Sequence, residues 1–175
     1  MSTERGEVQV RAGAETDLTA LTDLYNHYIR ETAITFDTEP FSPAQRRPWL
    51  LSHPKDGPHR LLVAQSAGEG DGPLLGYATS SAFRPKGAYA TSVETTVYCA
   101  PEAAGRGVGT LLYRALFAAL ADEDVHRAYA GITQPNEASV RLHSRFGFRP
   151  LGTFTEVGRK FGRYWDVAWY QKDLR

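Results

Sequence analysis

The spacing of apolar side chains along this 175-residue chain predicts alternating strands and helices. In residues 18–31 and 108–120 apolar positions recur every three to four residues, which is the period of a helix with one buried face. Shorter helices are expected at 43–51 and 136–146. Segments rich in Val, Ile, Thr and aromatic residues predict strands. The expected strands are residues 8–11, 61–65, 74–81, 91–99, 127–132 and 164–171.

Glycine and proline residues mark the connections between these elements. A glycine-rich loop at 67–73 is expected to join two neighbouring strands, and a turn at 157–162 to separate two closing strands. No repeat, low-complexity tract or linker interrupts the pattern. Residues 1–175 are therefore expected to form one α/β domain.

Composition and charge narrow the function classes. Apolar residues make up 42% of the chain, and 20 Lys and Arg residues balance 20 Asp and Glu residues. This charge balance leaves no basic footprint for nucleic acid, and no apolar run approaches the length that spans a membrane. The single cysteine permits neither an internal disulfide nor a thiolate cluster, and the histidine spacings match no metal motif. We expect a cytoplasmic protein without a metal, a nucleic-acid partner or a membrane partner.

The glycines at 105, 107 and 109 follow the strand expected at 91–99, which is predicted to be central, and lead into the helix that begins near Val108. Amide groups of such a turn and of the helix N-terminus can bind a phosphate. No lysine follows the glycines, which excludes a Walker loop, and the third glycine comes one position too early for a dinucleotide motif. The alternative is a turn that needs small residues for close packing.

Two motifs in this chain resemble those of the GNAT superfamily of N-acetyltransferases. The pattern Gln/Arg-x-x-Gly-x-Gly/Ala of the family's acetyl-CoA loop is matched by Gly107 and Gly109, with Ala104 at the first position. About thirty residues later, Asn136-x-x-Ser-x-x-Leu-His143, followed by Gly-Phe, is similar to the family's later helix motif.

Short stretches over nearly the whole chain further resemble the phosphinothricin N-acetyltransferase group. They include Asn26-His-Tyr-Ile, Thr38-Glu-Pro and the strand from Glu94 to Tyr98, whereas Tyr164 stands where that group often has Trp. The resemblance implies a GNAT fold, with a mixed, mostly antiparallel sheet of six to seven strands. Helices would cover both faces, and the central parallel strands would splay apart. It also implies transfer of acetyl from acetyl-CoA to the α-amine of a small substrate of the phosphinothricin or methionine sulfoximine type.

The resemblance also assigns residues to acetyl-CoA. Strand residues would pair with the pantetheine arm through their backbone, and the glycine turn would hold the pyrophosphate. The residues implied are Val97, Tyr98, Cys99, Gly105, Arg106, Gly107, Val108, Gly109, Thr110 and Asn136. An acetyl-cysteine on Cys99 is an alternative, but no histidine adjacent in sequence would activate this thiol, which favours a structural role.

Acetyl transfer to an amine also needs a base and a proton for the leaving thiolate. Strand alternation places Glu94 on the face of Tyr98 and opposite Val97, where poor solvation would raise the carboxyl pKa. The resemblance points to Glu94 as the general base, and the alternative is an exposed acid paired with an arginine. It points to His143 as the donor to the thiolate, with packing beside Leu142 as the alternative.

The acceptor amine would lie near the connection before the central strand. The resemblance implicates Arg84 and the turn Gly87, Ala88 and Tyr89, and Phe36 is expected to form an apolar wall. Arg84 would bind a substrate carboxylate, and its alternative is an exposed turn arginine. Core packing is the alternative for Phe36.

Rival functions remain at this point. Another amine, such as a different amino acid, a polyamine or a protein N-terminus, could be the acceptor. A CoA-binding module without turnover is the non-enzymatic alternative. Related enzymes are commonly homodimers, and the aromatic residues Trp165, Trp169 and Tyr170 would serve either such an interface or the core.

Overall fold

The computed structural model describes residues 6–68 and 72–175. Within these residues the chain forms seven strands, four α-helices and three short 3-10 turns. Their bounds are β1 Val8–Ala12, α1 Leu18–Glu31, α2 Pro43–Leu51, β2 Leu61–Ser66, β3 Leu74–Ala82, β4 Ser92–Cys99, α3 Val108–Leu120, β5 Arg127–Thr133, α4 Glu137–Arg145, β6 Arg149–Lys160 and β7 Arg163–Asp173.

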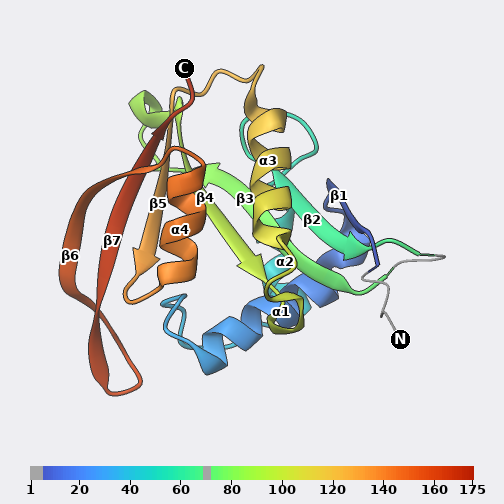
Figure 1. The fold of residues 1–175 in the computed structure, drawn as a ribbon, viewed down its shortest axis with the longest axis horizontal. Helices are drawn as coiled ribbons and strands as arrows, with labels where there is room; N and C mark the ends of the chain where they lie inside the picture. Colours follow the sequence, from blue (N-terminus) through green and yellow to red (C-terminus); the bar gives the residue numbers. More distant parts are fainter. Residues whose placement is uncertain (1–5, 69–71) are drawn as a thin grey trace.

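The strands of the described chain form one sheet in the order β1-β2-β3-β4-β5-β7-β6 (Figure 1). Neighbouring strands are antiparallel except for β4 and β5, which are parallel. The expected mixed, mostly antiparallel sheet of six to seven strands is thus confirmed.

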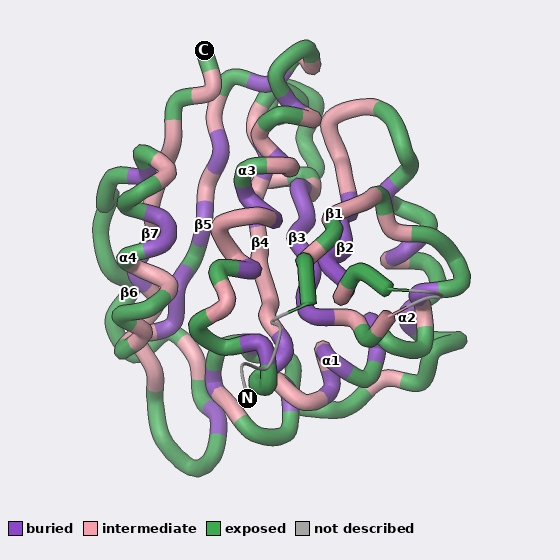
Figure 2. Tube along the Cα trace, turned by 45° about the vertical axis from the view of Figure 1, so that its right-hand side comes forward, coloured by how far each residue is buried: buried purple, intermediate pink, exposed green. Residues whose placement is uncertain are grey.

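Helices pack against both faces of the sheet, as the sequence predicted. A Cβ at Gly76 of β3 would lie 3.2 Å from Leu112 of α3, so this position faces α3. The next residue, Tyr77, faces the opposite side, where its ring lies 5.6 Å from that of Trp49 in α2. Buried positions concentrate on β2 and β3, whereas β6 is largely exposed (Figure 2).

The parallel strands β4 and β5 separate along their length. They are paired only from Ser92, opposite Arg127, to Glu94, opposite Tyr129. Beyond Glu94 the side of β4 that faces β5 has no partner strand among the described residues, while its other side stays paired with β3 up to Cys99. The splay expected between the central strands is therefore present, and it begins next to Glu94.

The expected closing turn at 157–162 is wrong in its extent. Strand β6 continues to Lys160, and the turn consists of Phe161 and Gly162, whose φ angles are 54° and 72°. A register shift between Phe154 and Gly158 lets β6 continue past the glycine without a break in the strand. The indole of Trp165 donates to the carbonyl of Lys160 at 2.9 Å and fastens the end of this hairpin.

The loop expected at 67–73 falls partly on residues 69–71, and these, like residues 1–5, lie outside the described residues. Among the helices that the structure describes, none combines the length and the apolar character needed to cross a bilayer.

Candidate active site

The splay between β4 and β5 opens a narrow cleft. Its volume is about 50 Å³, and it is lined by both strands and by the start of α4. Because the β4 edge beyond Glu94 is unpaired, its amide and carbonyl groups can pair with an extended, amide-bearing molecule as an added strand would. Among the predicted site residues, the lining includes Val97, Tyr98, Asn136 and His143.

The glycine turn lies where β4 leads into α3. Gly105 and Gly107 have φ angles of 75° and 72°, a left-handed conformation that favours glycine, and Gly107 is the N-cap of α3. The amides of Val108 and Thr110 belong to the first turn of α3, where helical N–H groups have no intrahelical acceptor. The backbone amide of Arg106 already donates to the carbonyl of Ala103 at 3.2 Å, so it belongs to the turn.

Gly109 has a different role from the other two glycines. It lies inside α3, and a Cβ at this position would be 3.1 Å from Leu142 of α4 and 3.7 Å from the Cys99 sulfur. Close packing against α4 therefore requires a small residue here. Only Gly105 and Gly107 have the left-handed conformation of a turn, and anion binding by the three glycines stays a prediction.

Asn136 caps α4 as the sequence predicted. Its side-chain oxygen accepts from the amide of Ser139 at 3.2 Å, and the residue also lines the cleft. At the other end of α4, Arg145 donates to the hydroxyl of Thr110 in the first turn of α3 at 3.3 Å. This places a cation next to the glycine turn. Sequence reasoning missed Arg145, although its position in the last turn of the second motif was a usable signal.

Glu94 occupies the last paired position of the parallel strands. It alternates with Val93 and Thr95, which are buried under α3, and so it faces the α1–α2 side with Tyr98. Burial raises the pKa of the Glu94 carboxyl, and the positive charge of Arg84 opposes this effect. A poorly solvated carboxylate with a raised pKa can accept a proton near neutral pH.

His143 is 3% exposed and forms a pair with Tyr113 of α3. Its Nδ1 donates to the carbonyl of Ser139 at 2.7 Å, so in the neutral ring Nε2 accepts from the Tyr113 hydroxyl at 2.8 Å. Burial lowers the pKa of His143 and raises that of Tyr113. Both side chains line the cleft. Their contact could not be predicted from local sequence patterns, because the two residues lie thirty positions apart and on different helices.

Cys99 is not an activated thiol in this structure. Burial raises its pKa to about 11, an effect that the amide of Gly109 partly offsets. Only the thiolate is strongly nucleophilic, so a raised pKa disfavours an acetyl-cysteine.

The residues predicted to bind the acceptor do not line the cleft between β4 and β5. Arg84 lies over the Phe83 ring at 4.2 Å, and Tyr89 contacts the same ring. Gly87, Ala88 and Tyr89 form a 3-10 turn between β3 and β4. Phe36 packs against Gly158 of β6, where a Cβ would lie 2.2 Å from its ring. None of these five is part of the cavity that lies on the Glu94 face of the described structure.

That cavity has a volume of about 240 Å³ and lies between the sheet and the helices α1 and α2. Its floor is made by cross-strand pairs of β3 and β4, and Ser81 at one end is paired directly with Glu94. Arg46 and Trp49 of α2 and Tyr25 of α1 form its walls. The sequence signal for Arg46 is its place three and four residues before Trp49 and Leu50, on the buried stripe of a helix.

Within residues 6–68 and 72–175, no three His, Cys, Asp or Glu side chains are grouped so that they could hold a metal ion.

The unpaired edge of β4 can pair with an extended, amide-bearing arm beside the half-buried Glu94, as an acyltransferase on an α/β fold requires. The profile of the Acetyltransferase (GNAT) family matches residues 21–148. The chain belongs to this family of acetyltransferases.

Individual relatives agree with that assignment. The chain is 73% identical over 168 residues to a phosphinothricin N-acetyltransferase of Streptomyces coelicolor, covering 96% of this chain and 97% of the relative. It is 32% identical to an L-methionine sulfoximine/L-methionine sulfone acetyltransferase of Pseudomonas paraeruginosa, over 94% of each chain. A phosphinothricin acetyltransferase of Sinorhizobium meliloti, solved in complex with acetyl-CoA, superposes with a TM-score of 0.88 at 30% identity, covering 95% of this chain and 88% of that one. The resemblance to this group is confirmed.

Proposed function

We propose that this protein transfers acetyl from acetyl-CoA to the α-amine of phosphinothricin, methionine sulfoximine or a closely similar amino acid. The observation that supports the acceptor class most strongly is the 73% identity to the Streptomyces coelicolor phosphinothricin N-acetyltransferase along almost the whole chain. The cleft between β4 and β5 supports the use of a pantetheine thioester, because it offers an unpaired strand edge next to Glu94.

In the proposed reaction the cosubstrate lies with its pantetheine arm along Val97, Tyr98 and Cys99. The pyrophosphate would be held by the Gly105–Gly107 turn and the amides of Val108 and Thr110 at the start of α3, with Asn136 bonding the pantetheine arm. The amide of Gly109 already bonds Cys99, so Gly109 would contribute through close packing beneath the turn. Arg106 would contribute its side chain, since its amide is already bonded within the turn. A backbone N–H of β4 would polarise the thioester carbonyl and stabilise the oxyanion.

Glu94 would take a proton from the acceptor ammonium or from the attacking amine. The amine nitrogen then forms a bond to the thioester carbon, and the carbon–sulfur bond breaks. The nitrogen loses its second proton as the amide forms, and the departing thiolate takes up one proton. His143, whose Nε2 is bonded to the Tyr113 hydroxyl, would pass this proton to the sulfur.

The predicted acceptor residues keep supporting roles in this proposal. Arg84 would tune Glu94, because its charge opposes the rise of the Glu94 pKa. Phe36 and the turn of Gly87, Ala88 and Tyr89 would border the entrance rather than the cavity itself.

A homodimer is the assembly that we propose. Leu151 and Phe154 of β6 are 51% and 55% exposed, and they line a hollow with Trp169 of β7 and Phe83. An apolar sheet face that no helix of the described chain covers fits a second copy. Light scattering on the purified protein measures this, and a monomer at micromolar concentration would contradict it.

The activity is tested by measuring thiol release from acetyl-CoA with a panel of amines. Phosphinothricin, methionine sulfoximine and methionine sulfone should be acetylated, and ordinary amino acids, polyamines and N-terminal peptides should react much more slowly. Turnover of a polyamine or peptide alone would refute the acceptor class. Binding of acetyl-CoA without acetylation of any amine would identify a non-catalytic module instead.

A further inference from the structure

Arg46 is a buried cation without a counter-ion in the cavity on the Glu94 face. The residue is 5% exposed, and it takes part in no ion pair among the described residues. Its Nε is buried and has no hydrogen-bond partner within that part of the chain. A buried charge without a partner is costly, and such groups are normally paired or hydrogen-bonded.

Aromatic rings hold the guanidinium in place. Its carbon lies 3.8 Å from the ring centre of Trp49 and 4.1 Å from that of Tyr25, so the planar group is held between two ring faces. Stacking of this kind stabilises a cation and orders a side chain that would otherwise be mobile. The side chain of Arg46 also forms a hydrogen bond with Tyr77, but no carboxylate of the described chain forms an ion pair with it.

The one carboxylate that lines the same cavity is engaged elsewhere. Asp37 is exposed and accepts a hydrogen bond from the Tyr25 hydroxyl. The remaining polar lining is uncharged: the hydroxyls of Thr79 and Thr96 bond each other at 2.7 Å, and that of Ser81 bonds His53 at 2.8 Å. Arg46 is therefore the fixed positive charge of this cavity.

The position of Arg46 relative to Glu94 limits which part of an acceptor it can reach. Glu94 is paired with Ser81 at one end of the cavity floor, and Tyr98 is paired with Tyr77 four strand positions further on. At about 3.3 Å per residue, these ends are roughly 13 Å apart along the strand. Tyr25, which contacts Arg46, lies 5.7 Å from Tyr98, and the Arg46 side chain bonds Tyr77, so the guanidinium lies near the Tyr77–Tyr98 pair.

In an amino acid the amine and the α-carboxylate are attached to the same carbon. In phosphinothricin four bonds separate the amine from the phosphorus. If the amine of the acceptor is at Glu94, its side-chain end is the part that would reach furthest toward Arg46, because the carboxylate is attached to the same carbon as the amine.

We propose that Arg46 is a specificity-determining residue that binds the anionic side-chain end of the acceptor, a phosphinate, through its guanidinium edge. This inference rests on the proposed acetyl transfer to a phosphinothricin-type acceptor. A guanidinium presents paired N–H donors to two oxygens of a phosphinate, as it does to a phosphate. Arg46 then favours an acceptor with a charged side chain over a neutral one of the same length.

The test compares phosphinothricin with methionine sulfone, which shares its amine, carboxylate and two-carbon spacer but has an uncharged end. Arg46→Met should lower kcat/KM for phosphinothricin roughly 10- to 100-fold, mainly through KM, because charge-assisted hydrogen bonds are lost. Methionine sulfone should change less than about threefold, and KM for acetyl-CoA should not change. The neighbouring Arg47→Met is the matched control, since Arg47 is exposed and paired with Glu15 on the surface.

Arg46→Lys keeps the charge and is the second variant if Arg46→Met does not fold. It should recover part of the phosphinothricin activity but not all of it, because an ammonium cannot bind two oxygens in a fixed plane. Equal losses for both acceptors would overturn the proposal and indicate a bond to the shared α-carboxylate or a structural role. Unchanged activity in Arg46→Met would overturn it as well.

The activity of the wild type toward the two acceptors distinguishes failure of this proposal from failure of the proposed function. Acetylation of methionine sulfone without phosphinothricin would leave the acetyltransferase assignment intact and refute the role of Arg46. If the wild type acetylates neither compound, the proposed function fails. Calorimetry of phosphinothricin binding to the wild type and to Arg46→Lys then still decides the role of Arg46: at least tenfold weaker binding supports it, and equal binding overturns it.

Discussion

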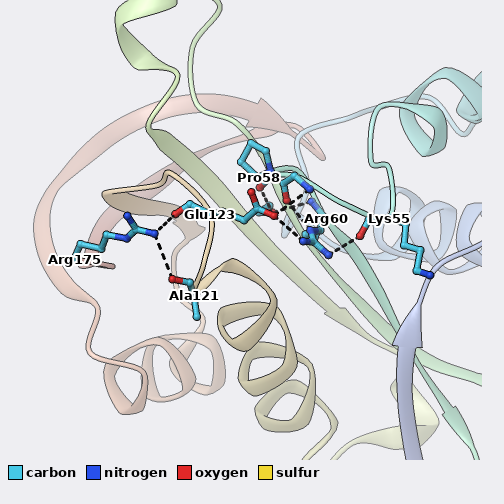
Figure 3. A network of polar contacts seen from close by, with 8 residues as sticks. Lys55, Pro58, Arg60, Ala121, Glu123 and Arg175 are labelled. Atoms are coloured by element: carbon cyan, nitrogen blue, oxygen red, sulfur yellow. Dashed lines mark hydrogen bonds and ion pairs between the residues drawn. The ribbon is translucent and has the colours of Figure 1, made fainter.

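Arg60 and Arg46 are two arginines with little solvent exposure, and their guanidinium groups contact different kinds of neighbour. Arg60, with 17% of its side chain exposed, donates Nη2 to Glu123 at 2.8 Å and Nε to the carbonyl of Gly57 at 2.6 Å (Figure 3). Its Nη1 donates to the carbonyl of Lys55. Arg46 is stacked between rings and has an unpartnered Nε.

The difference separates a structural arginine from one that is available to a ligand. All three nitrogens of Arg60 are bonded within the chain, and Glu123 also accepts from the amide of Gly57 at 3.1 Å. This network joins the loop before β2 to the segment after α3. Arg46, which is buried, and Glu94, which is half-buried, are charges that the described chain leaves without an ion-pair partner. A substrate that carries both opposite charges can supply these partners.

The largest effect expected is that of Glu94→Gln on activity. Loss of a general base should lower kcat by about 10²- to 10⁴-fold. In the wild type, kcat/KM should fall as the pH drops below the raised pKa of Glu94, because the protonated carboxyl cannot accept a proton. Steady-state rates between pH 5 and 9 measure both effects. Full activity of the variant across this range would exclude Glu94 as the base.

The same variant should not lose stability. A carboxyl whose pKa is higher in the folded than in the unfolded state binds protons on folding, so its ionised form opposes folding above the unfolded pKa. Replacing it with Gln removes this opposition at pH 7. Thermal unfolding should therefore show a variant at least as stable as the wild type, whereas a clear loss of stability would mean that Glu94 has a structural partner.

Arg60→Met should lower stability and leave activity unchanged, which is the reverse of Glu94→Gln. It leaves Glu123 without its cation in a partly buried place and should lower the free energy of unfolding by about 2 kcal/mol, between the values for surface and buried pairs. Denaturant titration measures this loss, and KM for both substrates should stay unchanged. Arg141→Met is the control: its pair with Glu137 has side chains 66% and 88% exposed, so it should contribute less than about 0.5 kcal/mol.

The different surroundings of Arg46 and Arg60 could not be predicted from the sequence, although the fold could. Periodicity placed α1, α2 and α3 correctly, and the β-branched run at 91–99 gave the central strand. These elements are set by local side-chain pattern. The turn of the closing hairpin was predicted at the wrong residues because Gly158 was interpreted as part of a local turn. The structure shows that a glycine is needed there to make room for the ring of Phe36, a residue more than a hundred positions away.

The candidate site was predictable where a residue's role depends on its own element. Glu94 faces the Tyr98 side as strand alternation predicted, and Asn136 caps its helix. The Tyr113–His143 pair and the stacking of Arg46 depend on contacts between separate elements. Local side-chain pattern carries no signal for such contacts beyond the unusual place of an arginine on a buried helix stripe.

Gly158→Ala tests whether Phe36 or Arg46 controls the acceptor. A Cβ would displace the Phe36 ring, which is 37% exposed and can move, so the variant should remain folded. If Phe36 only borders the entrance, KM for phosphinothricin and for methionine sulfone should rise equally, by no more than about fivefold, equivalent to about 1 kcal/mol. Gly152→Ala in the same strand is the control, since its Cβ would meet nothing within 4 Å. A larger effect on phosphinothricin than on the sulfone would assign charge selection to the Phe36 side instead of Arg46.

The smallest effect expected is that of Arg84→Met on the pH profile. Arg84 bonds only to the carbonyl of Phe83 among the hydrogen bonds of the described chain, and its charge lowers the pKa of Glu94 against the larger effect of burial. Removing this charge should shift the acid limb of kcat/KM to higher pH while leaving the plateau nearly unchanged. Because Arg84 is at the surface, raising the salt concentration should shift the wild-type limb toward that of the variant. Lys86→Met in the same connection should leave the limb in place. A limb that does not move in Arg84→Met would show that burial alone sets the pKa of Glu94, and that this surface arginine, unlike Arg46, takes no part in the site.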